Sequence, residues 1–555
     1  MSGIKTDVRR NSIAASAKRY WHTLRYLRPV QVYGRIWFQF KTPAPDNRAA
    51  PHPRRLTGTW SPAVKRPSSM DGGFVFNFLN RQAEVNGPTD WNAPGVDKLW
   101  LYNLHYFDDL NAIDASSRLP WHEGMINRWI LDNPPGQGNG WESYPLSLRL
   151  VNWIKWAMGG NALNDAWVQS LAVQTRYLQA RIEWHLLGNH LLANAKALLF
   201  AGCFFEGSES DTWRNTALEV LKREVQEQIL PDGGHFELSP MYHSIILEDL
   251  LDLINLTQAY PDVVPDSLVD TWVAVVTKMR RWLLAMLHPD NQISFFNDSA
   301  LGIANLPEEV EAYAEQLGMP AFEKPSEELT HLSDSGYVRV QRANEVAILD
   351  LAGIGPDYLP GHAHADTLSF ELSLFGQRTL VNSGTSVYGT CSERQRQRST
   401  SAHNTVEIDS RNSSEVWDGF RVAQRARPCG LEIEEHDSAL NIRCAHDGYH
   451  RLPGRVTHER EWCFLERTLT IKDMISGGHQ TAVARFHLHP DVSAQYDGTQ
   501  GVITLSHGQK IHWKTSDGIA RLIPTTWHPE FGLSVPNQCL EVTFTQTRCT
   551  TTFSW

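Results

Sequence analysis

Two histidines in one short segment are the first side chains whose type and spacing could do chemistry. His362 and His364 stand two positions apart in the segment GHAHAD, residues 361–366. In an extended segment alternate side chains point to the same face, so both imidazoles would share a site there, whereas a bend would separate them. Two neutral imidazoles at this spacing are a common metal-binding pair, although the pair alone is a weak signal.

Three further polar clusters contain groups that move protons or bind anions. The segment GNH at residues 188–190 precedes an apolar helical run, where its Asn is equally well explained as a helix N-cap. The segment DGGHFELSPMYH at 232–243 places many ionisable groups in a loop between two predicted helices, a position from which clefts are often built. Residues 394–405 combine three arginines with His403. Arginine binds carboxylates and sulfates bidentately, but such a run is also typical of an exposed charged loop.

The elements that position these clusters follow from the hydrophobic period. Between about residues 98 and 320, apolar side chains repeat at helical spacing in runs separated by Gly, Pro, Asn or Asp. Successive helix pairs with short connections predict an α/α toroid or a solenoid-like array. After about residue 328 the period changes to two, with turn residues at regular intervals, which is typical of an antiparallel β-sandwich.

The chain is therefore predicted to be multidomain, with an all-α part followed by an all-β part. We expect an N-terminal helical and irregular extension at residues 1–73, an α/α toroid at 74–327 and an antiparallel β-sandwich at 328–555. Clefts between domains commonly hold ligand sites, so we expect the polar clusters to meet between the toroid and the sandwich.

Composition and charge exclude several classes of function. The net charge of −11 argues against a general nucleic-acid binder, which needs a basic surface, but it permits an anionic glycan bound in a locally basic cleft. The seven cysteines are odd in number and include no C-x-x-C pair, so neither a disulfide framework nor a zinc ribbon is indicated. Neither a secretory signal nor a run of 18 apolar residues occurs, so we expect a cytoplasmic protein without a transmembrane helix, with non-classical export left open.

The segment at residues 20–40 is both basic and aromatic. A helix packed on the main domain is the favoured interpretation of this pattern. The alternative is a peripheral contact with a membrane, which uses the same residue types.

Taken together, the segments GNH, DGGHFELSPMYH, GHAHADTLSF and RSTSAHNTVEID resemble the heparinase II/III-like polysaccharide lyases, in that order and at similar separations. The resemblance is strong over residues 95–430 and weaker over the rest of the sandwich, and GHAHAD and AHNT are its most specific parts. It implies a toroid joined to a β-sandwich, in agreement with the hydrophobic period. It also implies cleavage of uronic-acid-containing glycans by β-elimination, in which a base removes the C5 proton and the 4-linked sugar leaves.

The resemblance implies catalytic roles for four residues. Asn189 matches the residue that neutralises the uronate carboxylate and so stabilises the enolate-like intermediate, and the adjacent His190 either assists or is structural. Tyr242 matches the tyrosine that exchanges a proton at the leaving oxygen, and His362 matches a cleft histidine that neutralises charge or abstracts a proton. Whether Tyr242 or a histidine is the base depends on the C5 configuration of the substrate, so both assignments stay open.

The resemblance also implies one divalent metal ion, zinc or manganese, in a structural role at the domain junction, and no organic cofactor. His364 and His403 match two of its ligands, and Asn382 stands where relatives place an Asp. An amide oxygen brings no charge and is a poorer zinc ligand than a carboxylate, so the sequence supports metal binding and its absence about equally.

Seven further residues are predicted to bind the anionic polysaccharide or oligosaccharide substrate: Trp141, Glu142, His235, Glu237, Tyr388, Arg394 and Arg398. Two other functions compete with the lyase. A glycoside hydrolase on a toroid fold needs two carboxylates flanking the scissile bond, for which Glu142, Asp232 and Glu237 are candidates. A non-catalytic glycan-binding protein of a surface-polysaccharide pathway would bind the same glycans without turnover.

Overall fold

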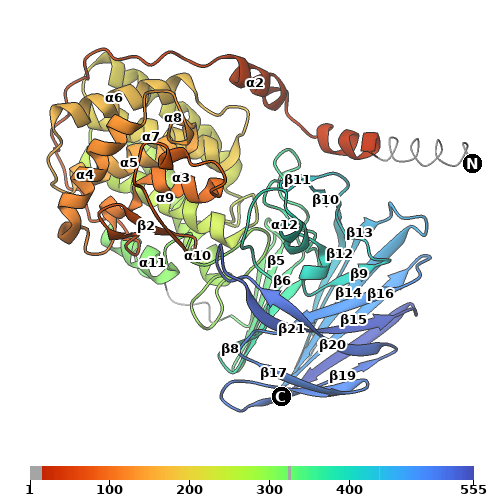
Figure 1. Cartoon of the computed structure of the whole chain (residues 1–555). Helices are drawn as coiled ribbons and strands as arrows, with labels where there is room; N and C mark the ends of the chain where they lie inside the picture. The colour runs from red at the N-terminus through yellow and green to blue at the C-terminus, as the bar shows by residue number, and fades with distance from the viewer. Residues whose placement is uncertain (1–15, 323–326, 437) are drawn as a thin grey trace, which may run out of the picture.

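The computed structural model describes residues 16–322, 327–436 and 438–555. Helices make up most of the first part of the chain and antiparallel sheets most of the second, so the predicted toroid-plus-sandwich architecture is confirmed (Figure 1). Within the described ranges, no helix combines the length and the apolar character needed to cross a bilayer.

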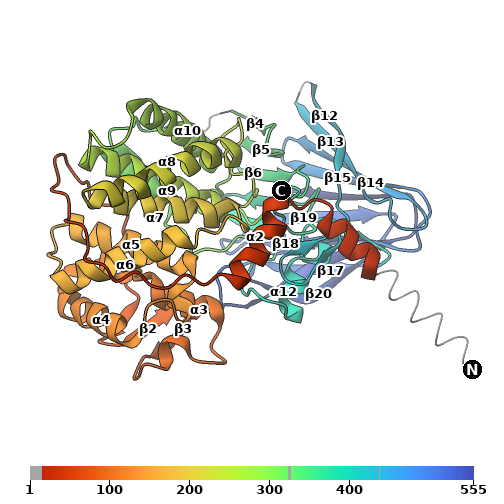
Figure 2. The same ribbon diagram turned by 90° about the horizontal axis from the view of Figure 1, so that it is seen from above.

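Among the described residues, nine helices form the helical part: α3 (Lys98–Tyr106), α4 (Leu119–Asp132), α5 (Ser143–Met158), α6 (Asp165–Ala180), α7 (Gly188–Phe204), α8 (Ser208–Gln228), α9 (Pro240–Ala259), α10 (Asp266–Ala285) and α11 (Pro307–Gln316). Several begin at a polar N-cap residue, whose side chain accepts hydrogen bonds from the first backbone N–H groups of the helix. The side chain of Asp97 accepts from the N–H groups of Leu99 and Trp100, and Ser239 accepts from that of Tyr242. Helix α7 is buried along nearly its whole length and lies among α5, α8 and α9 (Figure 2).

The N-terminal segment adds a helix at residues 16–24, helix α2 (Pro29–Phe40) and an irregular stretch. A small sheet follows, made of β1 (Met70–Gly72), β2 (Val75–Phe78) and β3 (Arg81–Glu84). The predicted boundary at 73/74 therefore falls inside the β1–β2 hairpin. The predicted residues 1–15 of the extension lie outside the described part of the chain.

Within the ranges that the structure describes, the β part contains three large antiparallel sheets. One runs in the order β4 (Leu329–Leu332), β5 (Tyr337–Arg342), β6 (Glu345–Asp350), β7 (Phe370–Leu374) and β8 (Gln377–Leu380). The largest runs in the order β12 (Pro428–His436), β13 (Ala439–Tyr449), β14 (Val456–Leu465), β15 (Thr468–Ser476), β22 (Arg548–Ser554), β19 (Lys510–Ser516), β18 (Gln500–Thr504) and β17 (Ser493–Asp497). The third is β20 (Ile519–Trp527), β21 (Val535–Phe544), β16 (Ala482–His487) and β9 (Val406–Ile408).

Alternate burial along the strands explains how these sheets pack. On β15 every second side chain is buried, as expected for a strand with one face in a core. One apolar cluster joins the sheets and includes Phe370, Trp462, Phe486 and Phe553. The segments on either side of β9 leave this core to form the wall next to the helices. They contain the short helix α12 (Ser392–Gln397) and the hairpin of β10 (Val416–Trp417) and β11 (Arg421–Val422).

A buried arginine of the sandwich fixes the loops that carry the predicted histidines. Arg460 on β14 donates to the carbonyl of Leu368 at 3.0 Å and to that of Asn404 at 2.6 Å. These carbonyls lie just after GHAHAD and within AHNT, respectively. The guanidinium also pairs with Asp473 on β15 at 2.7 Å, and both side chains are buried. The two loops are thus held at a set distance from the sandwich core.

Replacing Arg460 by Met is expected to destabilise the protein by about 3–5 kcal/mol, because Asp473 would remain buried without its cation. Burial alone would raise the pKa of Asp473, but the charge of Arg460 lowers it to about 2. The pair therefore stabilises the fold above the unfolded-state pKa of about 3.9 and loses this effect as the pH falls toward 2. Urea unfolding at neutral pH measures the loss of stability in Arg460→Met. Repeating it at acid pH tests whether the difference between variant and wild type becomes smaller.

Arg443→Met is the matched control. Arg443, on the neighbouring strand, pairs with Glu432, and these side chains are 43% and 49% exposed. An exposed pair contributes at most about 1 kcal/mol, so the control should remain close to the wild type. Equal losses in the two variants would contradict the role given to Arg460.

Candidate active site

The carboxylate of Asp298 lies at the centre of the site, on a loop between α10 and α11. It accepts from Nδ1 of His362 at 2.9 Å and from Nε2 of His364 at 2.8 Å. The guanidinium of Arg394 pairs with both of its oxygens, with Nη2 at 2.7 Å from Oδ2. Asp298 and Arg394 are both fully buried. One carboxylate therefore orients both histidines of GHAHAD.

The charge state of Asp298 follows from these partners. Burial alone would raise its pKa, but the charge of Arg394 and the hydrogen bonds from His362 and His364 hold the pKa well below its usual range. The group is therefore an anion at neutral pH, and it accepts one N–H hydrogen bond from each imidazole.

The imidazole of His362 lies against two tyrosines. Its ring centroid is 4.0 Å from that of Tyr242, which stands in the first turn of α9. The hydroxyls of Tyr242 and Tyr388 are 2.9 Å apart and share a hydrogen bond. Burial, reinforced by the other tyrosine and by Asp298, raises the pKa of Tyr242 well above its usual value. Both tyrosines and His362 thus form one group with protonated phenols.

The GNH segment forms the first turn of α7. Gly188 has φ +54°, and a Cβ there would collide with Leu359, so this start of the helix requires glycine. Among the described residues, the side-chain amide of Asn189 makes no hydrogen bond, although the residue is only 7% exposed. His190 lies 3.2 Å from Glu183 Oε2. Burial lowers the pKa of His190, but Glu183 more than compensates, so the net shift is upward.

Glu237 links these two groups. Its Oε2 lies 3.6 Å from Nε2 of His362, and its other oxygen lies beside Gly188. Glu237 is buried, and neither carboxylate oxygen has a side-chain hydrogen-bond partner in the described structure. Burial raises the pKa of Glu237. The structure therefore brings together Asn189, Glu237, Tyr242, His362 and Tyr388.

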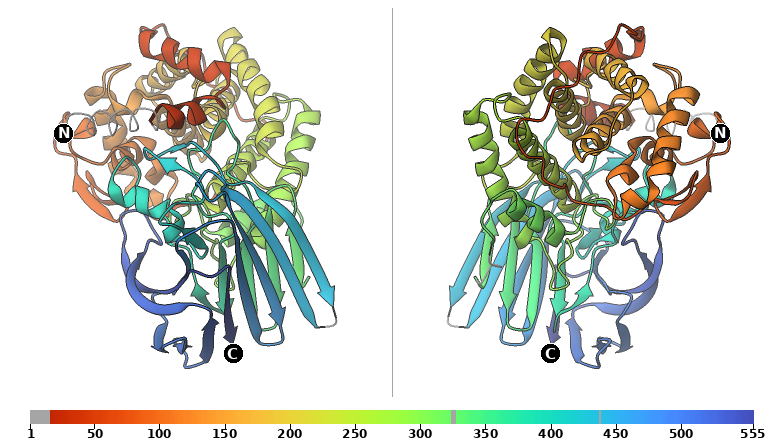
Figure 3. Two further views of the ribbon diagram at one scale, coloured as in Figure 1. Left: turned by 90° about the vertical axis from the view of Figure 1, so that its right-hand side faces the viewer. Right: turned by 90° about the vertical axis from the view of Figure 1, so that its left-hand side faces the viewer.

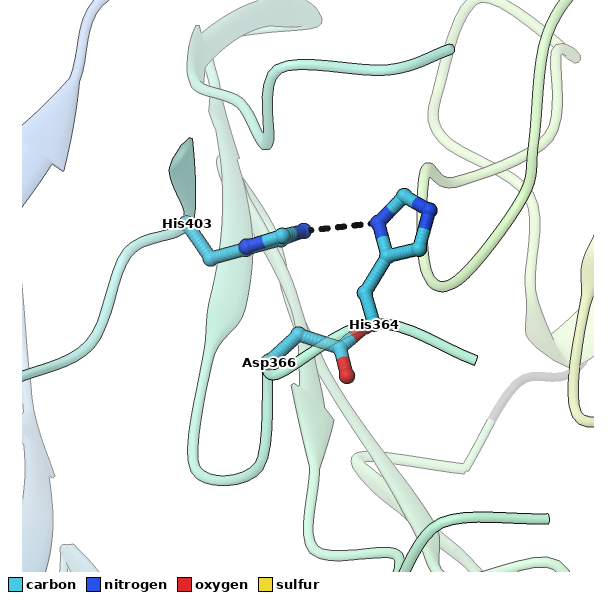
Figure 4. Close-up of side chains that lie close together, drawn as sticks. All are labelled: His364, Asp366 and His403. Atoms are coloured by element: carbon cyan, nitrogen blue, oxygen red, sulfur yellow. Dashed lines mark hydrogen bonds between the residues drawn. The ribbon is translucent and has the colours of Figure 1, made fainter. Parts of the chain in front are cut away.

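A second group of three side chains could hold a metal ion: His364, Asp366 and His403 (Figure 4). All three are buried, and their candidate ligand atoms lie within 4.8 Å of one another. Nδ1 of His364 is 3.1 Å from Nε2 of His403.

Counting protons tests whether this group fits a cation. His364 Nε2 faces the Asp298 carboxylate, and His403 Nδ1 lies 2.8 Å from the Ser399 carbonyl, so both outer contacts need an N–H. Two neutral imidazoles then have no proton left for the contact between them. Burial lowers the pKa of His364 to about 4 and also lowers that of His403, which disfavours an extra proton. A metal ion between the two nitrogens would remove the shortage and leave each outer N–H bonded, as is usual for metal-binding histidines.

The predicted ligand Asn382 is replaced in this group by Asp366. The amide of Asn382 donates to the Phe295 carbonyl at 3.0 Å and accepts from the Asn404 N–H at 3.1 Å. Both ends of this buried amide are therefore engaged with the backbone. Asp366, only two residues beyond His364, supplies the charged oxygen that Asn382 lacks.

Four residues predicted to bind substrate are fully or almost fully buried, and each is held by contacts within the protein. Their role in binding substrate stays a prediction. Trp141 stacks on Trp129 in the toroid core, and His235 bonds to Gln228 at 3.2 Å. Arg394 forms an ion pair with Asp298, and Arg398 donates to the Ala363 carbonyl at 2.9 Å. A local run such as RQRQR does not reveal that its arginines turn inward to neutralise a carboxylate and to hold the GHAHAD backbone.

Glu142 keeps an accessible position, with 42% of its side chain exposed, beside Lys98 and Tyr102. Its role in binding substrate stays a prediction. Asp298, the residue that orients the site, was missed by sequence reasoning. The only local signal was a polar N-D-S run directly after two phenylalanines, at residues 295–299.

Two family models match the chain, Heparinase II/III N-terminus over residues 159–318 and Heparinase II/III-like, C-terminal over residues 324–555. The chain belongs to the heparinase II/III-like family. A heparin-sulfate lyase of Bacteroides stercoris is 26% identical over 281 residues, 46% of this chain and 41% of that protein. FtsZ-localized protein C of Caulobacter vibrioides is 24% identical over 397 residues, 66% of this chain and 64% of that protein.

The matched stretches span less than half the length of the heparin-sulfate lyases compared. Among solved structures, the crystal structure of heparinase III has a TM-score of 0.72 at 18% identity and covers 94% of this chain and 89% of its own. At this identity the likeness establishes the shared fold of toroid and sandwich.

Replacing Asp298 by Asn is expected to destabilise the protein by about 3–5 kcal/mol in urea unfolding, because Arg394 would be left as a buried unpaired cation. Asp290→Asn is the control, since Asp290 pairs with Arg378 but is 40% exposed, and Arg378 keeps the Ile293 carbonyl as a partner. The double variant Asp298→Asn with Arg394→Met should recover part of the loss. Purely additive losses would show that the two residues are not coupled.

Proposed function

We propose that this protein is a polysaccharide lyase that cleaves uronic-acid-containing glycans by β-elimination. The observation that carries the proposal is the placement of His362, which Asp298 orients through Nδ1 while the ring contacts Tyr242. Such an elimination needs a base and an acid. A histidine oriented by a carboxylate can be the base, and a protonated phenol beside it can be the acid.

His362 is the base in this proposal. With its Nδ1–H donated to Asp298, the lone pair is on Nε2, and the side chain is 16% exposed, so a substrate can reach it. The fixed tautomer follows the same logic as other carboxylate-oriented catalytic histidines. Nε2 accepts the C5 proton, and the electron pair of that C–H bond moves into the forming C4–C5 double bond.

Tyr242 is the acid. Its raised pKa keeps the phenol protonated at neutral pH, which suits a donor to the leaving oxygen and not a base. The C4–O bond breaks as that oxygen takes the proton. The hydroxyl of Tyr388, 2.9 Å away, can supply a replacement proton to the phenolate of Tyr242.

Asn189 neutralises the substrate carboxylate. Its amide has no other side-chain hydrogen bond in the described structure and stands in the first turn of α7, where the positive end of the helix dipole favours an anion. Donors aimed at a carboxylate stabilise the enolate-like charge that develops as C5 loses its proton.

The substrate class rests on the relatives. Those named heparin-sulfate lyases make a glycosaminoglycan-like polymer the first substrate to try. The hydrolase alternative is not favoured, because its carboxylates do not form an accessible pair. Glu237 is buried, and Asp232 accepts from the backbone N–H groups of Asp334 and Ser335.

We further propose that His364, Asp366 and His403 hold one divalent ion, zinc or manganese. Tetrahedral zinc with bonds of about 2.0–2.1 Å places two ligand nitrogens about 3.3 Å apart, close to the 3.1 Å between the imidazoles. When bound, the ion would be a structural clamp between GHAHAD and the AHNT loop.

The lyase proposal predicts a new ultraviolet-absorbing unsaturated product from at least one of heparan sulfate, chondroitin sulfate, hyaluronan and alginate. Tyr242→Phe and His362→Ala should each lower kcat by roughly 10²–10⁴-fold, because each removes a proton-transfer group. Tyr496→Phe, at a half-exposed tyrosine on β17, is the matched control and should leave the rate unchanged. Saturated, hydrated product ends, or glycan binding without turnover in every variant, would contradict the proposal.

The metal proposal predicts about one zinc or manganese ion per chain by elemental analysis after loading and desalting, with a raised Tm. Asp366→Asn should reduce that content severalfold, since it removes the only charged ligand. Asp350→Asn is the matched control and should retain the ion. Asp350 is a neighbouring buried residue, and burial raises the pKa of its carboxyl group. Equal metal content in both variants would overturn the ligand assignment.

A further inference from the structure

Exposed apolar side chains gather on the N-terminal segment. Eight large apolar residues of this short stretch are more than one-third exposed: Tyr20, Trp21, Leu24, Val32, Tyr33, Ile36, Trp37 and Phe40. They belong to the helix at residues 16–24 and to α2. Figure 3 shows both helices at the end of the molecule opposite the C-terminal strand.

Five of these residues form one stripe on α2, made of Val32, Tyr33, Ile36, Trp37 and Phe40. Their spacing of one, four, five and eight positions places them on a single helix face. Their exposed fractions run from 51% for Val32 to 85% for Phe40. We refer to these five residues as the α2 stripe.

The opposite face of α2 is packed, so the helix is seated on the protein while the stripe stays bare. Gln31 donates to the Tyr358 carbonyl at 3.0 Å, and the ring of Phe38 lies 4.3 Å from that of His185. A Cβ at Gly34 would lie 2.9 Å from Cβ of His185, so the helix approaches the toroid closely. The predicted packing of this segment on the main domain is therefore present, and it leaves the α2 stripe facing solvent.

The stripe is as large as the main apolar patch of a typical monomer. Aromatic side chains offer roughly 150–250 Å² each, so the three exposed rings of the stripe with Val32 and Ile36 present about 500 Å². The largest apolar patch of a typical monomer is roughly 300–600 Å² and is often functional.

The segment that carries the stripe is basic. Residues 16–41 contain six basic side chains and no acidic one, in a chain of net charge −11. Arg19 and Arg28 pair with Glu415 and Glu227, whereas Lys18 and Arg35 make no ion pair with any described residue. Lys41 lies over the ring of Trp37, with Nζ 4.6 Å from its centroid.

We propose that this face docks on a lipid bilayer that contains anionic headgroups. The α2 stripe enters the headgroup region, and Lys18, Arg35 and Lys41 lie beside the lipid phosphates. Trp and Tyr on one face with Lys and Arg around it are the residue types of interfacial helices. The 12 residues of α2 span about 18 Å, too short to cross a bilayer, so the helix lies along its surface.

A second copy of the chain fits this face less well. Pairing two α2 stripes would bring two sets of unpaired cations together without an acidic partner on either segment, and like charges across an interface oppose association. An anionic surface matches both the apolar and the basic part of the face.

Vesicle flotation tests the proposal with the full chain. Wild type should float with vesicles of phosphatidylcholine and phosphatidylglycerol and bind pure phosphatidylcholine more weakly, with added salt reducing the difference. The variant Tyr33→Ser, Ile36→Ser, Trp37→Ser should bind at least about tenfold more weakly, because it removes most of the inserted apolar surface. Lys18→Gln, Arg35→Gln, Lys41→Gln should lose the preference for phosphatidylglycerol.

The matched control is Leu131→Ser, Tyr496→Ser, Ile519→Ser, which removes three exposed apolar side chains elsewhere. It should float as the wild type does, with circular dichroism and Tm reporting that every variant is folded. Three results would overturn the proposal: no flotation of wild type, equal loss in stripe and control variants, or stripe-dependent self-association in sedimentation velocity without lipid binding. Flotation needs no turnover, so its outcome is independent of the lyase assay.

Discussion

The buried pair of Asp298 and Arg394 is the interaction on which the rest of the site depends. Removing two charges from water is energetically unfavourable, and this desolvation free energy is offset only when both charges keep their partners. Asp298 meets this demand with a guanidinium and two imidazoles, contributed by segments 64 to 96 residues away in the chain. The toroid loop, GHAHAD and α12 must therefore come together for any of them to be satisfied.

The arginines near the site show how a charged run can serve structure. Arg394 neutralises Asp298, Arg398 donates to the Ala363 carbonyl, and Arg460 donates to carbonyls beside both histidine segments. None of these cations is left to bind an anionic substrate. In the proposed lyase, recognition of a uronate would depend on neutral donors such as Asn189 and on the helix dipole of α7, which suits a site that must stabilise charge only as it develops.

The fold and much of the site could be predicted from the sequence, because hydrophobic period and short motifs are local signals. Helical spacing before residue 320 and alternation after 328 determine the layers, and the motifs point to Asn189, Tyr242 and His362. Asp298 escaped because its partners are distant in the chain. The sequence also could not predict the burial of Trp141, His235, Arg394 and Arg398, because residue type does not show on which side of a loop a side chain lies. The sequence likewise does not show that Asp366, and not Asn382, lies beside the two imidazoles.

One hairpin connects the proposed docking face with the site. Trp417 on β10 packs edge-on against Tyr20 at 5.1 Å and donates to Thr23, both in the helix at residues 16–24. In the turn of this β10–β11 hairpin, directly after Trp417, the ring of Phe420 lies 5.2 Å from Tyr388, and the Gly419 carbonyl accepts from Arg394. A displacement of the N-terminal helix on a membrane surface would therefore act on Trp417 and, through it, on a wall of the site. The hairpin is therefore a physical connection between the proposed docking face and the candidate active site.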